Sequence, residues 1–144
     1  MSRRVWILAA LLSSGVGHAT EHTFPVAPQS AAQAQEQGLQ RLDADTLRRI
    51  YGGVREAQNL KGELTRQELL PDGKLLYSND KGVSGTGTWS VVDEDGGMIC
   101  RTFDFQGGRR LCTIYYAAPD GVHLFGYNAH DQLWRITTRR IEAR

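Results

Sequence analysis

Two cysteines, Cys100 and Cys112, have the type and spacing that point most directly to chemistry in this chain. Thiols either pair in a disulfide or bind a metal ion, and a metal site would need further ligands at a compatible spacing. The other candidates in the predicted domain are His123 and His130, which fall on a predicted strand and in a predicted turn without a shared face. The sequence therefore predicts a Cys100–Cys112 disulfide, no metal site and no cofactor.

Arginines and aromatic residues on predicted strands form a second candidate site. A guanidinium on a sheet face can bind a carboxylate or phosphate through two hydrogen bonds, and aromatic rings can line a barrel mouth. The residues that we expect to bind are Arg101, Arg109, Arg135, Arg139, Tyr115 and Trp134. Arg135 and Arg139 share one face of their strand because side chains alternate along a strand. The competing interpretation places the rings in the core and the arginines on the surface for solubility.

No set of catalytic residues is evident in the sequence. Gly82-Val83-Ser84-Gly85 resembles a nucleophile elbow, but Thr86 stands where that motif needs glycine. Asp93 and Asp95 match part of a calcium loop whose later bidentate Glu is missing. We therefore predict a noncatalytic protein. The alternative that stays open is a small periplasmic hydrolase or isomerase whose site is assembled only in the fold.

The first nineteen residues have the order of features of an export signal. Arg3 and Arg4 precede the apolar run 5–12, and Gly17-His18-Ala19 supplies the small residues of a cleavage site. The apolar run is shorter than the roughly 20 residues that span a bilayer. We expect cleavage near Ala19, a periplasmic or secreted mature protein and no membrane span.

The chain after the signal divides into a tether and one domain. Residues 20–38 are rich in Ala and Gln and poor in large apolar residues, which predicts a disordered tether with at most a marginal helix over 31–37. A single domain is expected over residues 39–144. There Leu42, Leu47 and Ile50 recur at helical spacing behind an N-cap at Asp43 or Asp45, which predicts a helix over 43–51.

From residue 63 onward, β-prone runs alternate with turn residues such as Pro71-Asp72-Gly73. The runs predict seven strands, over residues 63–70, 74–78, 85–92, 98–103, 109–116, 122–127 and 133–139. The connections are too short for crossover helices, so neighbouring strands must be antiparallel. A flat sheet of this size would leave two exposed edges. We therefore predict a mainly β fold, a seven-stranded antiparallel meander curled into a small closed or half-closed barrel, with one short N-terminal helix.

The disulfide also predicts a strand register. If Cys100 and Cys112 face each other across a hairpin, then Phe103 faces Arg109 around a longer loop, or Asp104 faces Gly108 around a shorter one. Directly opposed strand residues lie within the Cα separation that a disulfide accepts. Closing a loop this short should stabilise the fold by about 3 kcal/mol.

The order of several short motifs resembles a family of small exported bacterial domains of unknown function. These motifs are residues 42–52 with their final Gly, Pro71-Asp72-Gly73, Gly87-Thr88-Trp89 and the two cysteines. In that family a short helix ending in Gly precedes a β-meander with a Gly-Thr-Trp strand and two cysteines. The resemblance covers about residues 42–138. It implies the fold and a periplasmic setting, and it implies no particular activity.

The charge balance argues against polyanionic partners. The chain has 17 Lys and Arg and 16 Asp and Glu, so little counterion release would drive nucleic-acid binding, and no polybasic run would hold an anionic membrane. We predict an exported binding or accessory module of the bacterial envelope. It would hold an unknown small molecule or an envelope protein on a barrel mouth or a sheet face.

Overall fold

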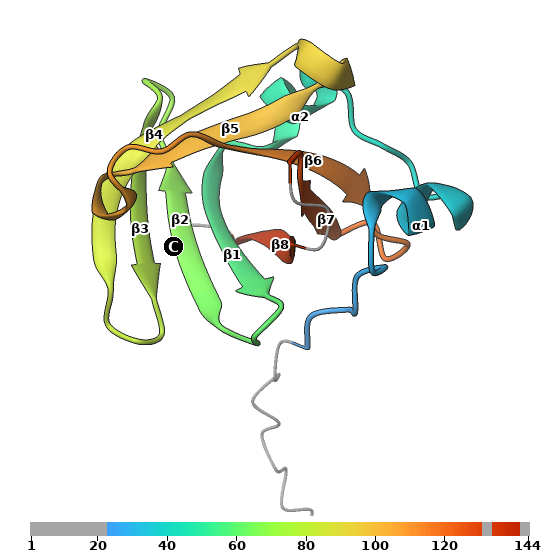
Figure 1. Cartoon of the computed structure of the whole chain (residues 1–144), viewed down its shortest axis with the longest axis horizontal. Helices are drawn as coiled ribbons and strands as arrows, with labels where there is room; N and C mark the ends of the chain where they lie inside the picture. The colour runs from blue at the N-terminus through green and yellow to red at the C-terminus, as the bar shows by residue number, and fades with distance from the viewer. Residues whose placement is uncertain (1–22, 131–133, 142–144) are drawn as a thin grey trace, which may run out of the picture.

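The computed structural model describes residues 23–130 and 134–141 as a closed barrel of eight antiparallel strands in the order β1 to β8 (Figure 1). The strands are β1 (Gly53–Asn59), β2 (Leu64–Leu69), β3 (Lys74–Asn79), β4 (Ser84–Val92), β5 (Met98–Phe103), β6 (Leu111–Ala117), β7 (His123–Asn128) and β8 (Arg135–Ile141). The short helices are α1 (Ala31–Glu36), α2 (Ala44–Ile50), and the 3₁₀ turns η1 (Glu94–Gly96) and η2 (Asp104–Gln106). The predicted export signal lies outside the described residues.

The predicted mainly β barrel is confirmed, with one strand more than expected. Each of the seven predicted strands is present within two residues of its predicted ends. The additional strand is β1, which pairs with β2 on one side and with β8 on the other, for example Glu56 opposite Arg139. Because β1 bridges the first and last predicted strands, it removes both sheet edges and closes the barrel.

Asx side chains fix the tight turns between the strands. Asn79 Oδ1 accepts from the N–H of Lys81, 3.0 Å away, and Asp120 Oδ1 accepts from the N–H of Val122, 2.9 Å away. Such bonds mimic a backbone turn, which is why these residues mark chain reversals. The turn signals in the sequence therefore predicted the meander correctly.

The disulfide joins β5 to β6 in the predicted register. Cys100 lies directly opposite Cys112, and η2 lies in the loop between the two strands. Both sulfurs are on the outer side of the wall, in a small buried cluster with Met98. The alternate residues of β5, Ile99 and Arg101, consequently point into the barrel.

Helix α2 begins at its predicted N-cap and closes one end of the barrel. The Asp43 carboxylate accepts from the N–H of Thr46 at 2.8 Å, which satisfies one of the free N–H groups of the first turn. Leu47 is fully buried against the core. Arg48 makes two hydrogen bonds of 2.9 and 3.0 Å to the carboxylate of Asp93, at the start of the η1 turn. Asp93, half of the calcium-like pattern, is therefore engaged with an arginine.

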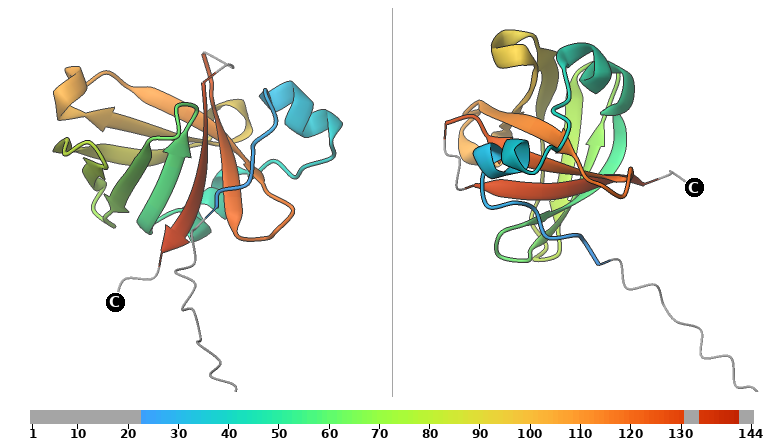
Figure 2. Two further views of the ribbon diagram at one scale, coloured as in Figure 1. Left: turned by 90° about the horizontal axis from the view of Figure 1, so that it is seen from below. Right: turned by 90° about the vertical axis from the view of Figure 1, so that its right-hand side faces the viewer.

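The segment expected to be a disordered tether packs on the outside of the barrel over its described part, residues 23–38 (Figures 1 and 2). Helix α1 is capped by Ser30, and its Ala34 is fully buried against an outer cluster of aromatic residues on β6 and β7. Tyr127 donates a hydrogen bond of 2.8 Å to the carbonyl of Pro28. The tether prediction was wrong here because the barrel supplies the large apolar surface that the segment itself lacks.

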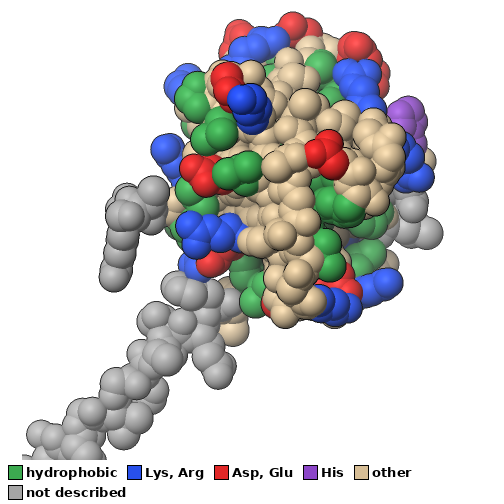
Figure 3. Space-filling model, turned by 90° about the vertical axis from the view of Figure 1, so that its left-hand side faces the viewer, with side chains coloured by type: hydrophobic (Ala, Val, Ile, Leu, Met, Phe, Trp, Pro, Cys, Tyr) green, Lys and Arg blue, Asp and Glu red, His purple; other side chains and the backbone are tan. Residues whose placement is uncertain are grey.

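The surface carries mixed charge. On the face seen in Figure 3, basic and acidic side chains are interspersed, in keeping with the near balance of charges in the sequence. Within the described residues, no helix is long and apolar enough to cross a membrane.

Candidate functional site

The barrel interior is apolar at the α2 end and becomes polar toward the middle. The apolar end contains Leu42, Leu47, Tyr51, Leu69, Leu75, Ile99, Tyr115 and Leu124, all buried. Trp89 is only half-buried at the edge of this cluster, where its Nε1 donates to the carbonyl of Leu70 at 2.8 Å. This end is closed, so any access to the interior must come from the opposite end.

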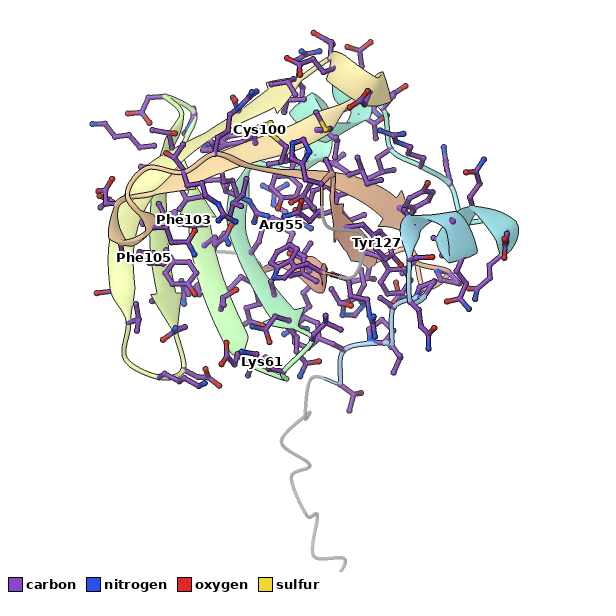
Figure 4. All side chains as sticks on the ribbon, in the orientation of Figure 1. Arg55, Lys61, Cys100, Phe103, Phe105 and Tyr127 are labelled. Atoms are coloured by element: carbon purple, nitrogen blue, oxygen red, sulfur yellow. A yellow bond between two sulfur atoms is a disulfide. The ribbon has the colours of Figure 1, made fainter. Side chains whose placement is uncertain are left out.

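Two arginines occupy the middle of the barrel. Arg55 on β1 is 4 % exposed and Arg101 on β5 is 3 % exposed, and Figure 4 shows Arg55 inside the ring of strands. Burial of a charged group in a protein interior is unfavourable by several kcal/mol unless other groups compensate for the lost water. The partners of these two guanidinium groups therefore decide what they can do.

Arg101 has an incomplete set of partners. Its Nη1 donates to the amide oxygen of Gln67 on β2, and its Nη2 donates to the hydroxyl of Thr113 on β6, each at 3.1 Å. Its Nε–H is buried and has no hydrogen-bond partner. A guanidinium has five N–H donors, so most of its donor capacity is unused.

Arg55 lies below Arg101, on the side of α2. Its Nε donates to the hydroxyl of Thr138 at 3.2 Å, and its guanidinium carbon lies 4.6 Å from the centre of the Tyr51 ring, as a cation–π contact. Burial lowers the pKa of Arg55; Tyr51 and Tyr115 oppose this shift, and the nearby charge of Arg101 adds to it. The hydroxyl groups of Tyr51 and Tyr115 lie 2.6 Å apart.

Neither arginine has an anionic partner within the described part of the chain. The ion pairs found there join other residues, and all involve side chains outside the barrel interior or on its rim. Tyr115 does not supply a negative charge, because burial raises its pKa well above the ordinary value and keeps the phenol neutral. The middle of the barrel thus holds two like charges with neutral partners.

A cavity of about 210 Å³ lies above Arg101 and is lined by residues of the barrel end opposite α2. It is lined by Ala57, Asn59, Glu63, Thr65, Gln67, Tyr77, Arg101, Phe103, Phe105, Gln106, Leu111, Trp134 and Ile136. We call this cavity the mouth cavity. Arg101 and Gln67 form its floor, and aromatic side chains form much of its wall.

Three rings form one wall of the mouth cavity. The ring centres of Tyr77 and Phe103 are 5.3 Å apart, and Phe105 lies 5.1 Å from Tyr77 and 5.3 Å from Phe103. Figure 4 shows Phe103 and Phe105 close together at this end. Gly85 makes room for the group, since a Cβ atom there would lie 2.9 Å from the Phe105 ring. The absence of a side chain at Gly85 on β4 therefore leaves the space that the Phe105 ring occupies.

The rim of the cavity carries one carboxylate that is already engaged. Glu63 accepts hydrogen bonds from Lys81 and, at 2.8 Å, from the side-chain amide of Asn59. The bond from Lys81 is the main reason that the pKa of Glu63 is lowered, and Asn59 lowers it further. Glu63 is therefore held at the rim by Lys81 and pairs with neither buried arginine.

A larger hollow of about 330 Å³ lies on the outside of the wall, beside Phe24 and strands β2 and β3. Its charged lining residues include Arg66 and Asp80, which are exposed to solvent. Exposed charges are solvated by water and need no ligand. The mouth cavity is smaller, but it alone of the two is lined by a buried, incompletely paired charge.

The structure places the predicted binding residues in two groups. Arg101 and Trp134 line the mouth cavity, and Tyr115 lies below it in the barrel interior. Arg109 is exposed in the loop that follows η2. Arg135 and Arg139 share a face of β8, as predicted, but it is the outer face. There Arg139 pairs with Glu56 at 2.7 Å, and Arg135 donates to the carbonyl of Gln29 at 3.4 Å. The expectation that all four arginines meet at one site is therefore wrong.

Sequence reasoning missed several residues of the site. Arg55 was overlooked because β1 was not predicted, and Gln67, Tyr77 and Thr113 were seen only as strand residues. A signal was present in the sequence. Gln67 lies two residues before Leu69, and Thr113 lies two residues before Tyr115, so each polar residue shares a strand face with a large side chain. Apolar alternation indicates which face is inside, so a polar residue on that face marks the interior site.

Comparisons with known proteins add no relatives. No family model matches the chain, and neither the curated proteins nor the solved structures include a detectable match. The resemblance to a family of small exported domains therefore stays a prediction.

Proposed function

We propose that this chain is a noncatalytic binding protein that takes a small ligand into the mouth cavity of its barrel. The observation that carries the proposal is the guanidinium of Arg101, which is buried, faces a cavity and has no anionic partner within the described residues. A buried charge of this kind is unfavourable for folding, and such groups concentrate at functional sites.

The surroundings of Arg101 also favour ligand binding. Barrels of about eight strands are wide enough to hold one small ligand, and barrel mouths are frequent ligand sites. The cavity combines apolar rings with a few polar groups at its floor, which is the usual composition of a small-molecule site. The disulfide fixes β5 against β6, the strands that carry Arg101 and Thr113, so the floor is held rigidly.

The lining of the mouth cavity favours recognition over catalysis. Among the described residues that line it, Glu63 is the only acid, and neither serine, cysteine nor histidine is present. A nucleophile with an adjacent base would require at least two such groups in contact. The hydrolase or isomerase alternative gains no support from this composition.

We further propose that the protein works outside the cytoplasm, as a module of the bacterial envelope. Support comes from the signal-like residues 1–19 and from the disulfide, since disulfides persist mainly in oxidising compartments. A small molecule is the partner that the mouth cavity accommodates; an envelope protein bound on a sheet face is the other predicted partner.

The test uses the oxidised full-length chain and the aromatic anion 8-anilinonaphthalene-1-sulfonate, whose fluorescence rises when one of its rings enters an apolar site. Thr65→Trp fills the mouth cavity from β2, whereas Leu64→Trp adds the same ring on the exposed outer side of that strand. We expect saturable fluorescence enhancement with the wild-type protein and with Leu64→Trp, and little with Thr65→Trp. No enhancement with the wild type, or equal enhancement with Thr65→Trp, would contradict binding in the mouth cavity.

A further inference from the structure

We infer that the ligand is a small aromatic monocarboxylate, bound with its carboxylate on Arg101 and its ring between the aromatic wall and Trp134. This inference rests on the proposed function, because it assigns chemistry to the ligand of the same cavity. Three properties of the mouth cavity support it: the charge and donors of its floor, the depth of that floor, and the size of the cavity.

The floor favours an anion with one charge and two acceptor oxygens. Arg101 is the only arginine among the described lining residues, because Arg55 lies deeper and does not line the cavity. Its unpaired Nε–H and the remaining N–H groups of the fork can bond two oxygens at once, in the bidentate geometry that arginine forms with carboxylates. A phosphate monoester would bring three acceptor oxygens and close to two charges at neutral pH, whereas Arg101 is the one guanidinium among the described lining residues.

The distance between the charge and the rings sets the length of the ligand. Arg101 and Phe103 point into the barrel from the same strand, two residues apart, so their Cα atoms are separated by about 7 Å along β5. A ring packed against Phe103 would therefore lie one short linker away from a carboxylate on Arg101. Two or three linking carbon atoms fit this spacing better than a direct bond between ring and carboxylate.

The volume of the cavity limits the buried part of the ligand to about one ring. At about 210 Å³, the cavity is smaller than the roughly 300–1,000 Å³ of typical small-molecule pockets. A benzene ring with a short acid chain fits this space, whereas a long acyl chain would have to leave through the mouth. Rings prefer edge-to-face or offset contacts with other rings, and the three-ring wall offers both edges and faces.

The experiment compares ligands that differ in one group. 3-Phenylpropanoate has the acid, the linker and the ring; 3-phenylpropanamide keeps the shape and lacks the charge; propanoate keeps the charge and lacks the ring. Binding to the oxidised full-length chain is measured by calorimetry and by shifts of the backbone amide resonances. We expect 3-phenylpropanoate to bind at least tenfold more tightly than either of the other two, with shifts confined to the mouth cavity.

A protein variant then assigns the discrimination to Arg101. In Arg101→Gln the acid and the amide should bind with similar affinities, because the charge that separates them is gone. The matched control is Arg66→Gln, which removes an exposed arginine from the outer side of β2 and should preserve the tenfold difference. If Arg101→Gln does not fold, the comparison of acid and amide on the wild-type protein still decides the question.

The outcomes separate this inference from the proposed function. If 3-phenylpropanoate and 3-phenylpropanamide bind the mouth cavity equally well, the carboxylate inference is wrong while ligand binding in the barrel stands. If 2-phenylethyl phosphate binds more tightly than 3-phenylpropanoate, the anion is a phosphate and the inference is again wrong. If none of the probes, including 8-anilinonaphthalene-1-sulfonate, shifts resonances of the mouth cavity, both proposals fail together.

Discussion

Replacing the polar floor of the mouth cavity by apolar side chains of similar shape should make the protein more stable. The triple variant Arg101→Met, Gln67→Leu, Thr113→Val removes the buried charge together with the two groups that receive its hydrogen bonds. Removing both partners of a hydrogen bond can be nearly neutral, because no unpaired polar group stays behind. The free energy of unfolding should therefore change mainly through the loss of the buried charge.

The size of the gain follows from what such replacements achieve elsewhere. Exchanging buried charged groups for well-packed apolar residues often stabilises a protein by about 1–4 kcal/mol. For a domain of this length, 1 kcal/mol raises the melting temperature by about 4 °C. We expect the triple variant to melt at least about 4 °C above the wild type, measured by circular dichroism without ligand and with the disulfide intact.

The control is Arg66→Met, an exposed position on β2 where the melting temperature should barely change. The single variant Arg101→Met should gain less than the triple variant, because it leaves Gln67 and Thr113 without their donor. A triple variant that melts below the wild type would mean that Arg101 holds β2, β5 and β6 together. In that case the residue is structural, and the reasoning that assigns it to a ligand is refuted.

Three further predictions test the fold around the site. Gly87→Ala should unfold the barrel or lower its melting temperature by more than 10 °C, roughly the effect of losing 2–3 kcal/mol, because the added Cβ would lie 1.8 Å from the carbonyl oxygen of Thr102. A melting temperature equal to that of the wild type would contradict the close approach of β4 to β5. A hydrogen bond from the backbone of Thr46 lowers the pKa of Asp43, so its contribution to stability is present above about pH 4 and is lost as the pH falls through the folded-state pKa. Asp43→Asn should therefore melt like the wild type at pH 7 and lose less stability between pH 5 and pH 3, and equal loss in both proteins would argue against this cap. Ala34→Glu should lower the melting temperature by several degrees because Ala34 is fully buried on the side of α1 that faces the barrel, whereas Ala32→Glu on the exposed side of the same helix should not. Equal melting temperatures of the two variants would mean that α1 is not docked on the barrel.

The sequence predicted those parts of the fold that depend on local signals. Asx and Gly residues marked the turns, and the two cysteines gave the register of β5 and β6 because opposed positions on a hairpin follow from counting residues. Asp43, one of the two predicted N-caps, caps α2, and such a cap can be predicted because it acts within one helical turn. These features need no knowledge of distant contacts.

The first strand was missed because its alternation is hidden. On β1, two of the three inward residues, Arg55 and Asn59, are polar, as are the outward residues Glu56 and Gln58, so apolar and polar residues do not alternate. A strand is recognised from sequence when one of its faces is apolar, and the inner face of β1 is polar because it belongs to the site. The polar inward residues of β1 therefore explain both why the strand was missed and why it contributes to the candidate site.

The N-terminal segment was misjudged for a different reason. Its buried residues, such as Ala27, Ala31 and Ala34, are small, so its own composition resembles that of a disordered chain. The apolar area comes from Tyr116, Phe125 and Tyr127 on the outer face of β6 and β7. Small side chains allow close approach to these rings, and composition alone does not reveal such a complementary surface.

The candidate site was predicted in part. Arg101 and Trp134 were expected to bind and do line one cavity, whereas Arg135 and Arg139 face outward from β8. The period of two correctly placed the last two on one face, but it does not say which face is inside. That choice is made by the closure of the barrel, which depends on β1.

The most direct test of the account is the Nε–H resonance of Arg101, observed by nitrogen-15 NMR in the oxidised full-length protein during a titration with 3-phenylpropanoate. The account predicts that this N–H, which has no partner in the free protein, shifts strongly and becomes protected from hydrogen exchange as the ligand saturates. The Nε–H of exposed Arg66 should not move. An Arg101 resonance that stays unchanged at saturating ligand, or shifts no larger than those of exposed arginines, would contradict the claim that Arg101 is held in the barrel to bind an anion.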